Sequence, residues 1–449
     1  MDDIAVSPGS TAVAYIHSRH YVDSKRQATR LFVQSFNCNN HYNDSPLVLV
    51  DHIAEDPAGQ PRDPEAEERK TGVASTEFTK KLKPSQPVWL SNTVLGFVAP
   101  DVSSNGSVLY AVSKRNGRWS TPEHVVSLPI PISSVQFNTE SGILAFTAEV
   151  YNEASTVEET VCIDGQDMKE LVDATDHRKT DATPRITQIY TLKLMSTSDN
   201  SFKPTGQLRN IIKDSDAGGR LEALGSFVFS PTGRQVAFVA KKPGNGYAKR
   251  TTSNIYLADT DGSSTVPISS DTSGSSSSPT FNHNGTKVAF VQTASPTQEQ
   301  HVRNQIKVFS IAERTITTVA TEWDYFPAQM EWADDSSALL LTYNERGVRK
   351  LSKIDVATGI VTEIFSSHAV SFFKVLSGTG KLLINYSALD SPNDLYTIAT
   401  DGSFLTRITN MNPKLSREVS LSELARPERP RRSASSTWKW APVCMPPRN

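Results

Sequence analysis

One short pattern recurs seven times along this chain and constrains its fold more than any other feature. Each copy has an apolar or aromatic residue, a tight turn and an apolar strand, most clearly from Phe227 to Val239 around Ser230-Pro231-Thr232-Gly233. Proline presets φ at the second turn position, and glycine accepts the positive φ that such turns need. Each copy therefore predicts a β-hairpin. The seven turns begin at Ser7, Ser91, Asn138, Ser230, Asn282, Ala333 and Ser377.

In the best-defined copies, a further strand and a second tight turn follow the hairpin at a nearly constant offset. The strand Ser253–Asp259 is followed by Asp261-Gly262, and the strand Asp394–Ile398 is followed by Asp401-Gly402. Each Asp-Gly pair predicts a turn into a last short strand. Four short strands per unit, repeating at about 40–50 residues, are typical of β-propeller blades.

The spacing of the turns predicts the number of blades. The intervals between the last four turns are 52, 51 and 44 residues, and the interval from the second turn to the third is 47. The first interval, 84 residues, and the third, 92 residues, are each long enough to contain an extra blade. We interpret them instead as insertions at about 54–80 and 151–185, because both stretches are polar and lack the turn pattern.

The sequence therefore predicts an all-β, seven-bladed β-propeller over 1–420. A Pro-, Arg- and Ser-rich tail at 421–449 has no strand or helix periodicity, and we expect it to be disordered. The alternatives are a pair of stacked β-sandwich domains and a β-helix with long coils. Neither explains a four-strand repeat that always opens with the same turn.

Charge and composition exclude several classes of protein. Lys and Arg number 46 against 48 Asp and Glu, a net charge of −2, which argues against a general polyanion binder such as a nucleic-acid protein. No apolar run approaches the roughly 18 residues of a membrane span. The start Met1-Asp2-Asp3-Ile4 has neither a basic nor an apolar leader region, so it predicts a cytoplasmic protein if that start is correct.

Residues that bind metals or perform catalysis are sparse. Cys38, Cys162 and Cys444 form no CxxC pair; we expect three unpaired thiols, with a Cys38–Cys162 bridge as the alternative. His17 and His20 are three apart and point to opposite faces of a strand, so we expect no metal site there. No Gly-x-Ser-x-Gly, phosphate-binding loop or zinc-protease motif occurs, so we expect no catalytic residue and no cofactor.

Two other segments admit a structural and a functional interpretation. Glu322-Trp323-Asp324 precedes a predicted innermost strand, so its carboxylates could meet a ligand in a central channel; we favour an aromatic packing element between blades. The serine-rich run Ser269–Ser278 is interpreted as a flexible loop between blades. Four sequons, about the number expected by chance, are candidate glycosylation sites: Asn43, Asn105, Asn284 and Asn385.

The ordered set of motifs resembles a known family. The turn at Phe229–Gly233, the run Glu322–Asp335 and the run Asp394–Asn410 are similar to the propeller of the dipeptidyl-peptidase V branch of the prolyl oligopeptidase family of serine peptidases. The segment Thr175–Thr180, ahead of Gln188–Leu192, resembles an insertion of that branch. The resemblance extends over roughly residues 5–420.

The resemblance implies an activity that this chain does not carry by itself. Members are secreted and cleave short peptides with a Ser-Asp-His triad on an α/β-hydrolase domain that follows the propeller and is gated by it. Here the family pattern stops near Leu421 and gives way to Arg426-Pro427-Glu428-Arg429, which we interpret as a frameshift or intron read-through in the gene model. We therefore expect a truncated, inactive gating propeller whose peptide substrates would meet a hydrolase domain absent here.

Two alternatives to this function belong to other classes. One is a stand-alone propeller that acts as a protein- or ligand-binding scaffold. The other is a propeller that is itself a lyase or glycosidase, which requires carboxylates or histidines converging on the channel. Nothing in the sequence recommends the second.

Overall fold

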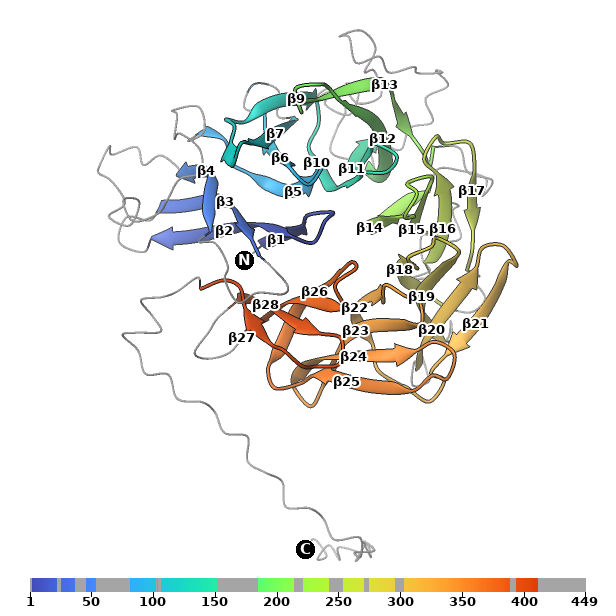
Figure 1. Ribbon diagram of the computed structural model, residues 1–449. Helices are drawn as coiled ribbons and strands as arrows, with labels where there is room; N and C mark the ends of the chain where they lie inside the picture. The colour runs from blue at the N-terminus through green and yellow to red at the C-terminus, as the bar shows by residue number, and fades with distance from the viewer. Residues whose placement is uncertain are drawn as a thin grey trace, which may run out of the picture.

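The structure is a ring of seven antiparallel sheets, each of which is one blade (Figure 1). Strands follow one another in sequence order from the centre of the ring outwards, so the predicted all-β, seven-bladed β-propeller is confirmed. This computed structural model describes residues 2–21, 26–36, 46–53, 81–101, 103, 106–151, 185–213, 221–241, 253–269, 274–294, 303–387 and 393–410.

The strands of the seven blades fall into four sets according to their position in the blade. The innermost strands are β1 (Asp2–Val6), β5 (Ser85–Trp89), β10 (Ile132–Asn138), β14 (Glu222–Phe229), β18 (Ser276–Phe281), β22 (Pro327–Trp332) and β26 (Ala369–Leu376). The second strands are β2 (Ala12–Tyr21), β6 (Val94–Pro100), β11 (Ile143–Tyr151), β15 (Gln235–Lys241), β19 (Lys287–Ala294), β23 (Ala338–Glu345) and β27 (Lys381–Ser387). The third strands are β3 (Arg26–Ser35), β7 (Ser107–Arg115), β12 (Arg185–Ser196), β16 (Asn254–Asp259), β20 (Arg303–Ser310), β24 (Val348–Asp355) and β28 (Asp394–Ala399). The outermost strands are β4 (Leu47–Ile53), β9 (Glu123–Leu128), β13 (Phe202–Asn210), β17 (Thr265–Pro267), β21 (Thr315–Val319), β25 (Val361–Phe365) and β29 (Thr406–Arg407), and a short β8 (Arg118–Trp119) also pairs with β7.

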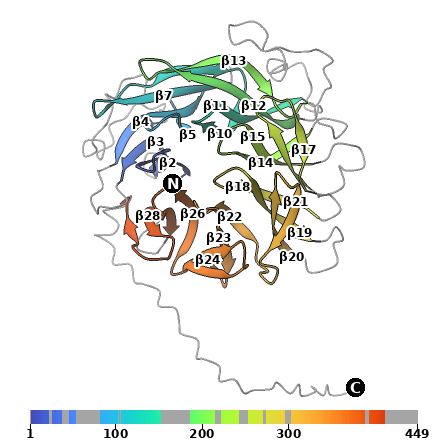
Figure 2. The same ribbon diagram turned by 45° about the vertical axis from the view of Figure 1, so that its right-hand side comes forward.

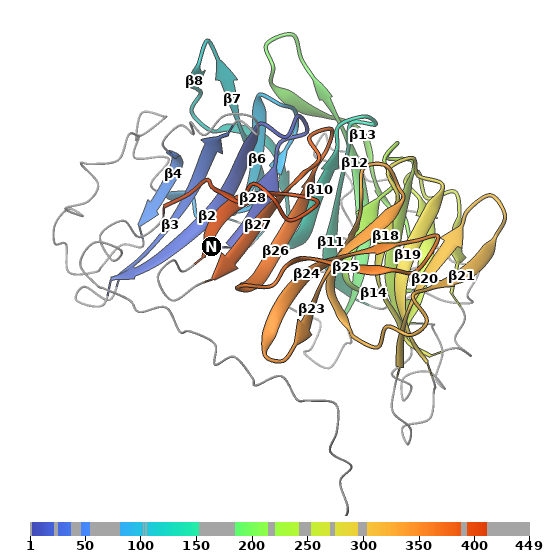
Figure 3. The same cartoon turned by 60° about the horizontal axis from the view of Figure 1, so that its bottom comes forward.

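This up-and-down order gives the ring two ends, seen edge-on in Figure 3. The turns after the innermost and third strands lie at one end, which we call the turn face. The hairpins after the second strands and the links between blades lie at the other, which we call the connection face. The two predicted insertions lie almost entirely outside the described residues, and their flanking strands belong to the seven blades already counted.

The serine-rich run departs from the sequence-based expectation. Ser276 to Ser278 begin β18, which lines the channel, so the prediction of a loop is wrong for this part of the run. Ser276 is fully buried, and its backbone N–H donates to Ser253 O at 2.7 Å. Tertiary contacts of this kind outweigh the weak strand preference of serine.

The hydrophobic core lies between blades rather than at one centre. The second strand of a blade packs on both neighbouring blades, so its two faces are buried; from Val236 to Ala240 every residue is at most 8% exposed. Ring pairs repeat across these strands, as between Phe238 and Tyr256, whose centroids are 5.7 Å apart. This double burial explains the continuous apolar runs after each turn, a pattern more usual in sheets covered on both faces.

Each of the seven innermost strands has a β-bulge or irregularity in its pairing with the second strand. In four strands a non-glycine residue takes a left-handed φ near this point: Asp3 (48°), Gln86 (47°), Ser134 (52°) and Ser278 (54°). A bulge redirects a side chain that would otherwise follow the alternation of the strand. The side chains of Asp3 and Gln86 bond to the neighbouring blade, and Figure 2 shows the innermost strands β5, β10, β14, β18, β22 and β26 arranged around the centre of the ring.

Glutamine side chains bridge the innermost strands of adjacent blades. Gln86 Nε2 donates to Ile132 O at 3.1 Å, and Gln86 Oε1 accepts from Val135 N at 3.0 Å. Gln329 binds both backbone groups of Phe373 in the next blade, at 2.6 and 3.1 Å. These bonds satisfy strand-edge groups that face the channel.

The glycines of the Asp-Gly and Thr-Gly turns have a second role besides the turn. Gly402 has φ +88°, and a Cβ there would lie 2.7 Å from the carbonyl oxygen of Ile364 in the preceding blade. Gly359 has φ +73°, and its Cβ would lie 3.2 Å from backbone atoms of Ala320. Only glycine allows both the left-handed backbone and this approach of one blade to another.

Blades 1 and 7 close the ring without exchanging a strand. All four strands of blade 1 come from the start of the chain, and all four of blade 7 are consecutive near residue 400. Val13, Tyr15 and Phe32 of blade 1 share a buried cluster with Leu383 and Leu395 of blade 7. In addition, Gln34 Nε2 donates to Ile408 O at 2.7 Å.

We expect Gly402→Ala to destabilise the propeller more than Gly347→Ala. Gly347 also has a left-handed φ, +80°, but a methyl group there meets no atom within 4 Å. We expect Gly347→Ala, the control, to lower the free energy of unfolding by about 1–2 kcal/mol through backbone strain alone. Gly402→Ala should lower it by about 1–3 kcal/mol more, because its methyl group clashes with Ile364. Urea denaturation measures both values. Equal losses would contradict the role of Gly402 in packing between blades.

Gln329→Leu should lower the free energy of unfolding by about 1–3 kcal/mol, because both backbone groups of Phe373 lose their partner. Gln305→Leu is the matched control, since Gln305 is also half-buried and has no side-chain bond within the described chain. Denaturation and amide exchange at Phe373 provide the measurements. Unchanged protection of the Phe373 amide would refute the contact.

Candidate functional site

The central channel is hollowed near the turn face into a cavity of about 380 Å³. Blades 3 to 7 each contribute the end of an innermost strand and the start of the following turn. Phe137, Phe229, Phe281 and Trp332 occupy the same position in four successive blades and form an aromatic part of the wall. The aromatic residue of the sequence repeat therefore becomes the lining of a cavity.

The charged residues of this cavity are used in contacts between blades 6 and 7. Lys374 Nζ lies 2.7 Å from Glu331 Oε1, and Glu331 Oε2 accepts from Val375 N at 3.0 Å. Asp334 Oδ2 accepts from the backbone N–H of Gly378 at 2.8 Å. The Lys374 side chain is 49% exposed, so a polar ligand in the cavity can still reach its ammonium group.

The connection face carries an aromatic cluster beside a charge network. Trp323, Tyr325 and Tyr343 have ring centroids 4.9–5.6 Å apart. The Tyr325 hydroxyl donates to Glu345 at 3.1 Å, and this bond raises the pKa of Tyr325. Lys350 lies 2.7 Å from both Glu345 and Glu363; these bonds lower the pKa of each carboxyl and raise the pKa of Lys350.

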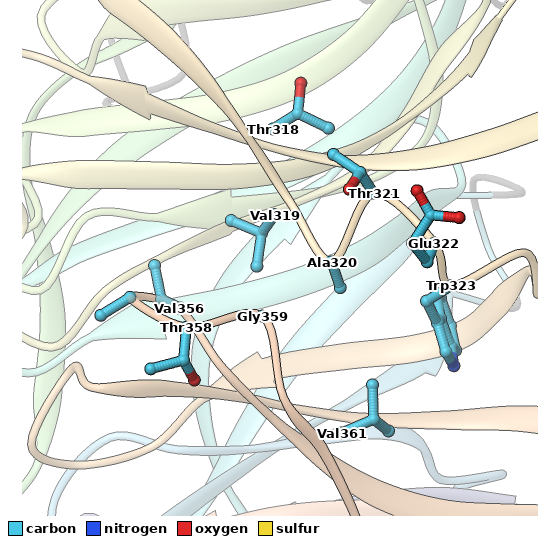
Figure 4. Close-up of a pocket in the computed structure, with 11 residues that line it drawn as sticks. Thr318, Val319, Ala320, Thr321, Glu322, Trp323, Val356, Thr358, Gly359 and Val361 are labelled. Carbon is cyan, nitrogen blue, oxygen red and sulfur yellow. The ribbon is translucent and has the colours of Figure 1, made fainter.

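The segment Glu322-Trp323-Asp324 is a packing element, as favoured from the sequence. Trp323 packs against the buried cluster between blades 5 and 6. Glu322 and Asp324 are exposed, and Glu322 lines a groove on the outer rim (Figure 4) rather than the channel cavity. The alternative of channel-lining carboxylates is therefore wrong for Glu322.

The other sequence-predicted site residues are dispersed. His17 opposes Arg30 across β2 and β3, with its ring 6.2 Å from that of Phe32. Within the described ranges no group of three His, Cys, Asp or Glu residues is arranged to hold a metal. The three cysteines lie outside the described residues.

The four sequons have unequal surroundings. Asn43 and Asn105 lie outside the described residues. Asn284 is exposed in the turn after β18. Asn385 is 2% exposed within β27, and its side-chain oxygen accepts from Ser371 at 2.7 Å.

The glutamines that join the innermost strands of neighbouring blades were not identified from the sequence. Gln86, Gln136 and Gln329 stand five, two and four residues before a repeat turn, in strands that are otherwise partly apolar. A polar side chain in a partly buried strand needs a hydrogen-bond partner, so the position of these glutamines was the signal available in the sequence. The partner lies in another blade, so the pairing itself was not visible in the repeat.

No protein-family model matches the chain. The sequence is 26% identical over 360 residues to the probable dipeptidyl-peptidase 5 of Emericella nidulans, covering 76% of this chain and 48% of that protein. It is 27% identical over 371 residues to dipeptidyl-peptidase 5 of Aspergillus fumigatus, covering 76% of this chain and 50% of that protein. The chain thus spans about half the length of these curated relatives.

Solved structures share the fold at low sequence identity. The acylaminoacyl peptidase of Pyrococcus horikoshii matches 93% of this chain and 53% of its own, with a TM-score of 0.55 and 13% identity. The β-propeller domain of the Trilobed protease of Pyrococcus furiosus, described as having an open velcro topology, matches 92% of this chain and 98% of its own, with a TM-score of 0.55 and 10% identity. No helix in the described part of this chain has the length and hydrophobicity to cross a membrane. The chain is therefore homologous to the fungal dipeptidyl-peptidases 5 over about 76% of its length and has the fold of the propeller domains of prolyl oligopeptidase-family peptidases.

Proposed function

We propose that this chain is the substrate-gating propeller of a dipeptidyl-peptidase 5-like serine peptidase. The proposal rests on how much of its relatives' length this chain covers. The chain is homologous to these peptidases yet spans half their length, and the described part is a ring that matches an isolated protease propeller nearly end to end. In the whole protein the other half would supply the hydrolase domain, and peptides would be its substrates.

The size of the channel and the way its wall is held support the proposed gating. The cavity of about 380 Å³ accommodates a short stretch of peptide. A folded domain of 100 residues, with a radius of gyration of about 13 Å, is far too large. Glutamine bridges between innermost strands, such as Gln329 to Phe373, oppose widening of the channel. The ring would therefore admit short peptides and exclude folded proteins.

We expect the chain itself to have no peptidase activity. The sequence contains no Gly-x-Ser-x-Gly, and peptide hydrolysis by this class needs a nucleophile, a base and an oxyanion hole in one site. Purified protein should release no chromophore from a dipeptidyl p-nitroanilide above the buffer rate. Hydrolysis that co-purifies with the chain and resists removal of contaminants would refute this prediction.

The gating role itself needs a catalytic partner to be tested. We would replace the propeller of the Aspergillus fumigatus relative with residues 1–420 and compare the chimera with the isolated hydrolase domain. The chimera should cleave the dipeptidyl substrate and leave casein intact. Equal cleavage of casein by the chimera and the isolated domain would contradict gating.

A stand-alone propeller that binds a protein or ligand is the second candidate function. The exposed Tyr325 and Phe326 on the connection face favour it, because exposed aromatic side chains are enriched at binding surfaces. Genomic sequence downstream discriminates the two functions. A Gly-x-Ser-x-Gly in another reading frame within a few hundred codons supports the peptidase, and its absence supports the scaffold.

If the protein is secreted as a glycoprotein, Asn284 rather than Asn385 should carry a glycan on the folded propeller. Asn284 is exposed, whereas Asn385 is 2% exposed and bonded to Ser371. After expression with a secretory leader, Asn284→Gln should remove one glycan from the mass and Asn385→Gln none. A glycan on Asn385 of the folded protein would contradict the described burial.

A further inference from the structure

A hairpin of blade 2 projects from the turn face of the ring (Figure 3). It joins the end of β7 to β8, which is two residues long, and Arg115 pairs with Arg118 across its tip. Between these two arginines, Asn116 and Gly117 are exposed and have φ of 49° and 77°. Two consecutive left-handed residues form the tight hairpin turn for which Asn-Gly is strongly preferred.

An asparagine followed by glycine is also open to a reaction within the chain itself. The backbone nitrogen of the glycine attacks the side-chain carboxamide carbon of the asparagine and closes a five-membered ring, and glycine has no Cβ to block the approach. The sequence has four such pairs, which begin at Asn105, Asn116, Asn245 and Asn284. The structure describes both residues of the second and the fourth pair, so these two can be compared in the folded chain.

The reacting groups at the tip of the blade 2 hairpin are not held by other residues. Within the described chain, the carboxamide of Asn116 has no hydrogen-bond partner, and the N–H of Gly117 has no acceptor. The turn is closed by a strand of two residues, so little structure has to open before the backbone at Asn116 rotates.

The charges around this turn favour the reaction. The Gly117 nitrogen has to lose its proton before it attacks, and a nearby positive charge stabilises the anion that results. Arg115 and Arg118 are exposed on either side of the turn and form no ion pair within the described residues. Like charges directly opposite each other across a strand pair are unfavourable, so the hairpin would also be stabilised by a carboxylate at its tip.

The pair Asn284-Gly285 has the same sequence but is held in place. Asn284 Oδ1 accepts from Thr286 Oγ1 at 2.6 Å and from Asn282 Nδ2 at 2.7 Å. The Gly285 N–H, which carries the attacking nitrogen, donates to Asn282 O at 3.0 Å. The turn also lies against blade 4, since a Cβ on Gly285 would be 3.3 Å from Pro231 Cδ. Rotation of the backbone at Asn284 therefore requires several contacts to break.

We propose that Asn116 is a site of spontaneous modification, at which the asparagine is converted through a cyclic imide to aspartate and isoaspartate. The Gly117 nitrogen gives its proton to hydroxide and forms a bond to Asn116 Cγ. The bond from Cγ to Nδ2 then breaks, and the amide nitrogen leaves as ammonia. One water adds to either carbonyl of the ring and opens it to the acid, with no oxidation or reduction. The site is independent of the proposed gating function.

The two products differ in their effect on the hairpin. Both place a carboxylate between Arg115 and Arg118. Aspartate-glycine also suits the tight turn, so the aspartate form keeps the hairpin. Isoaspartate adds a methylene carbon to the backbone, and because loop length fixes the register of a hairpin, this form loses the pairing of β7 with β8.

The experiment incubates the full chain at mildly alkaline pH and follows the loss of the side-chain amide by peptide mass spectrometry. In the folded chain Asn116 should convert at least about tenfold faster than Asn284, the effect of about two weak hydrogen bonds on opening of the turn. In urea the two sites should convert at similar rates, because both are then Asn-Gly in an open chain. Labelling by an isoaspartyl methyltransferase should locate isoaspartate at residue 116.

A substitution at the attacking residue tests the chemistry. A Cβ on Gly117 meets no atom within 4 Å, so Gly117→Ala should fold, hinder the attack on Asn116 and leave the rate at Asn284 unchanged. The proposal is overturned if Asn284 converts as fast as Asn116 in the folded chain, or if Gly117→Ala converts as fast as the native chain. It is also overturned if Asn116 keeps its amide in the folded chain while the chain in urea loses it.

Discussion

The structure depends on how the innermost strands of neighbouring blades are held together. Each strand has a bulge, and at several blades the redirected side chain or a nearby glutamine bonds the backbone of the next blade. A strand edge facing an open channel would otherwise leave backbone groups without protein partners. The same bonds also hold the innermost strands in place around the channel, so stability and the proposed gating would rest on one set of contacts.

Local turn chemistry made most of the fold predictable. Gly233, Gly262 and Gly402 were identified as turn residues because glycine accepts left-handed φ, and all three have it. What the repeat did not reveal depends on the neighbouring blade. The glutamine bridges join residues 44 to 91 positions apart, and Ser276 of β18 is held by Ser253 of the preceding blade. Such contacts leave only a faint local signal, a polar residue within a strand that packs on another blade.

The candidate sites were harder to predict than the fold for a related reason. The channel cavity takes its wall from five blades, and the rim groove takes its two sides from a link in one blade and a turn in the next. Glu322 and Glu331 are nine residues apart, yet Glu331 is paired with Lys374 whereas Glu322 has no partner in the described chain. That difference decides which carboxylate is available to a ligand, and it arises only when the blades are assembled.

Closure of the ring bears on whether the proposed gating is separable from catalysis. Blades 1 and 7 are each built from four consecutive strands, so no strand from another part of a longer protein is needed to complete the described ring. Their seam relies on the buried cluster around Tyr15 and Leu383 and on the bond from Gln34 to Ile408. We expect a ring closed by packing and side-chain bonds to hold its channel whether or not a hydrolase lies against it. The proposed gating and scaffold functions therefore make the same demand on this fold, and they differ in what binds to the ring.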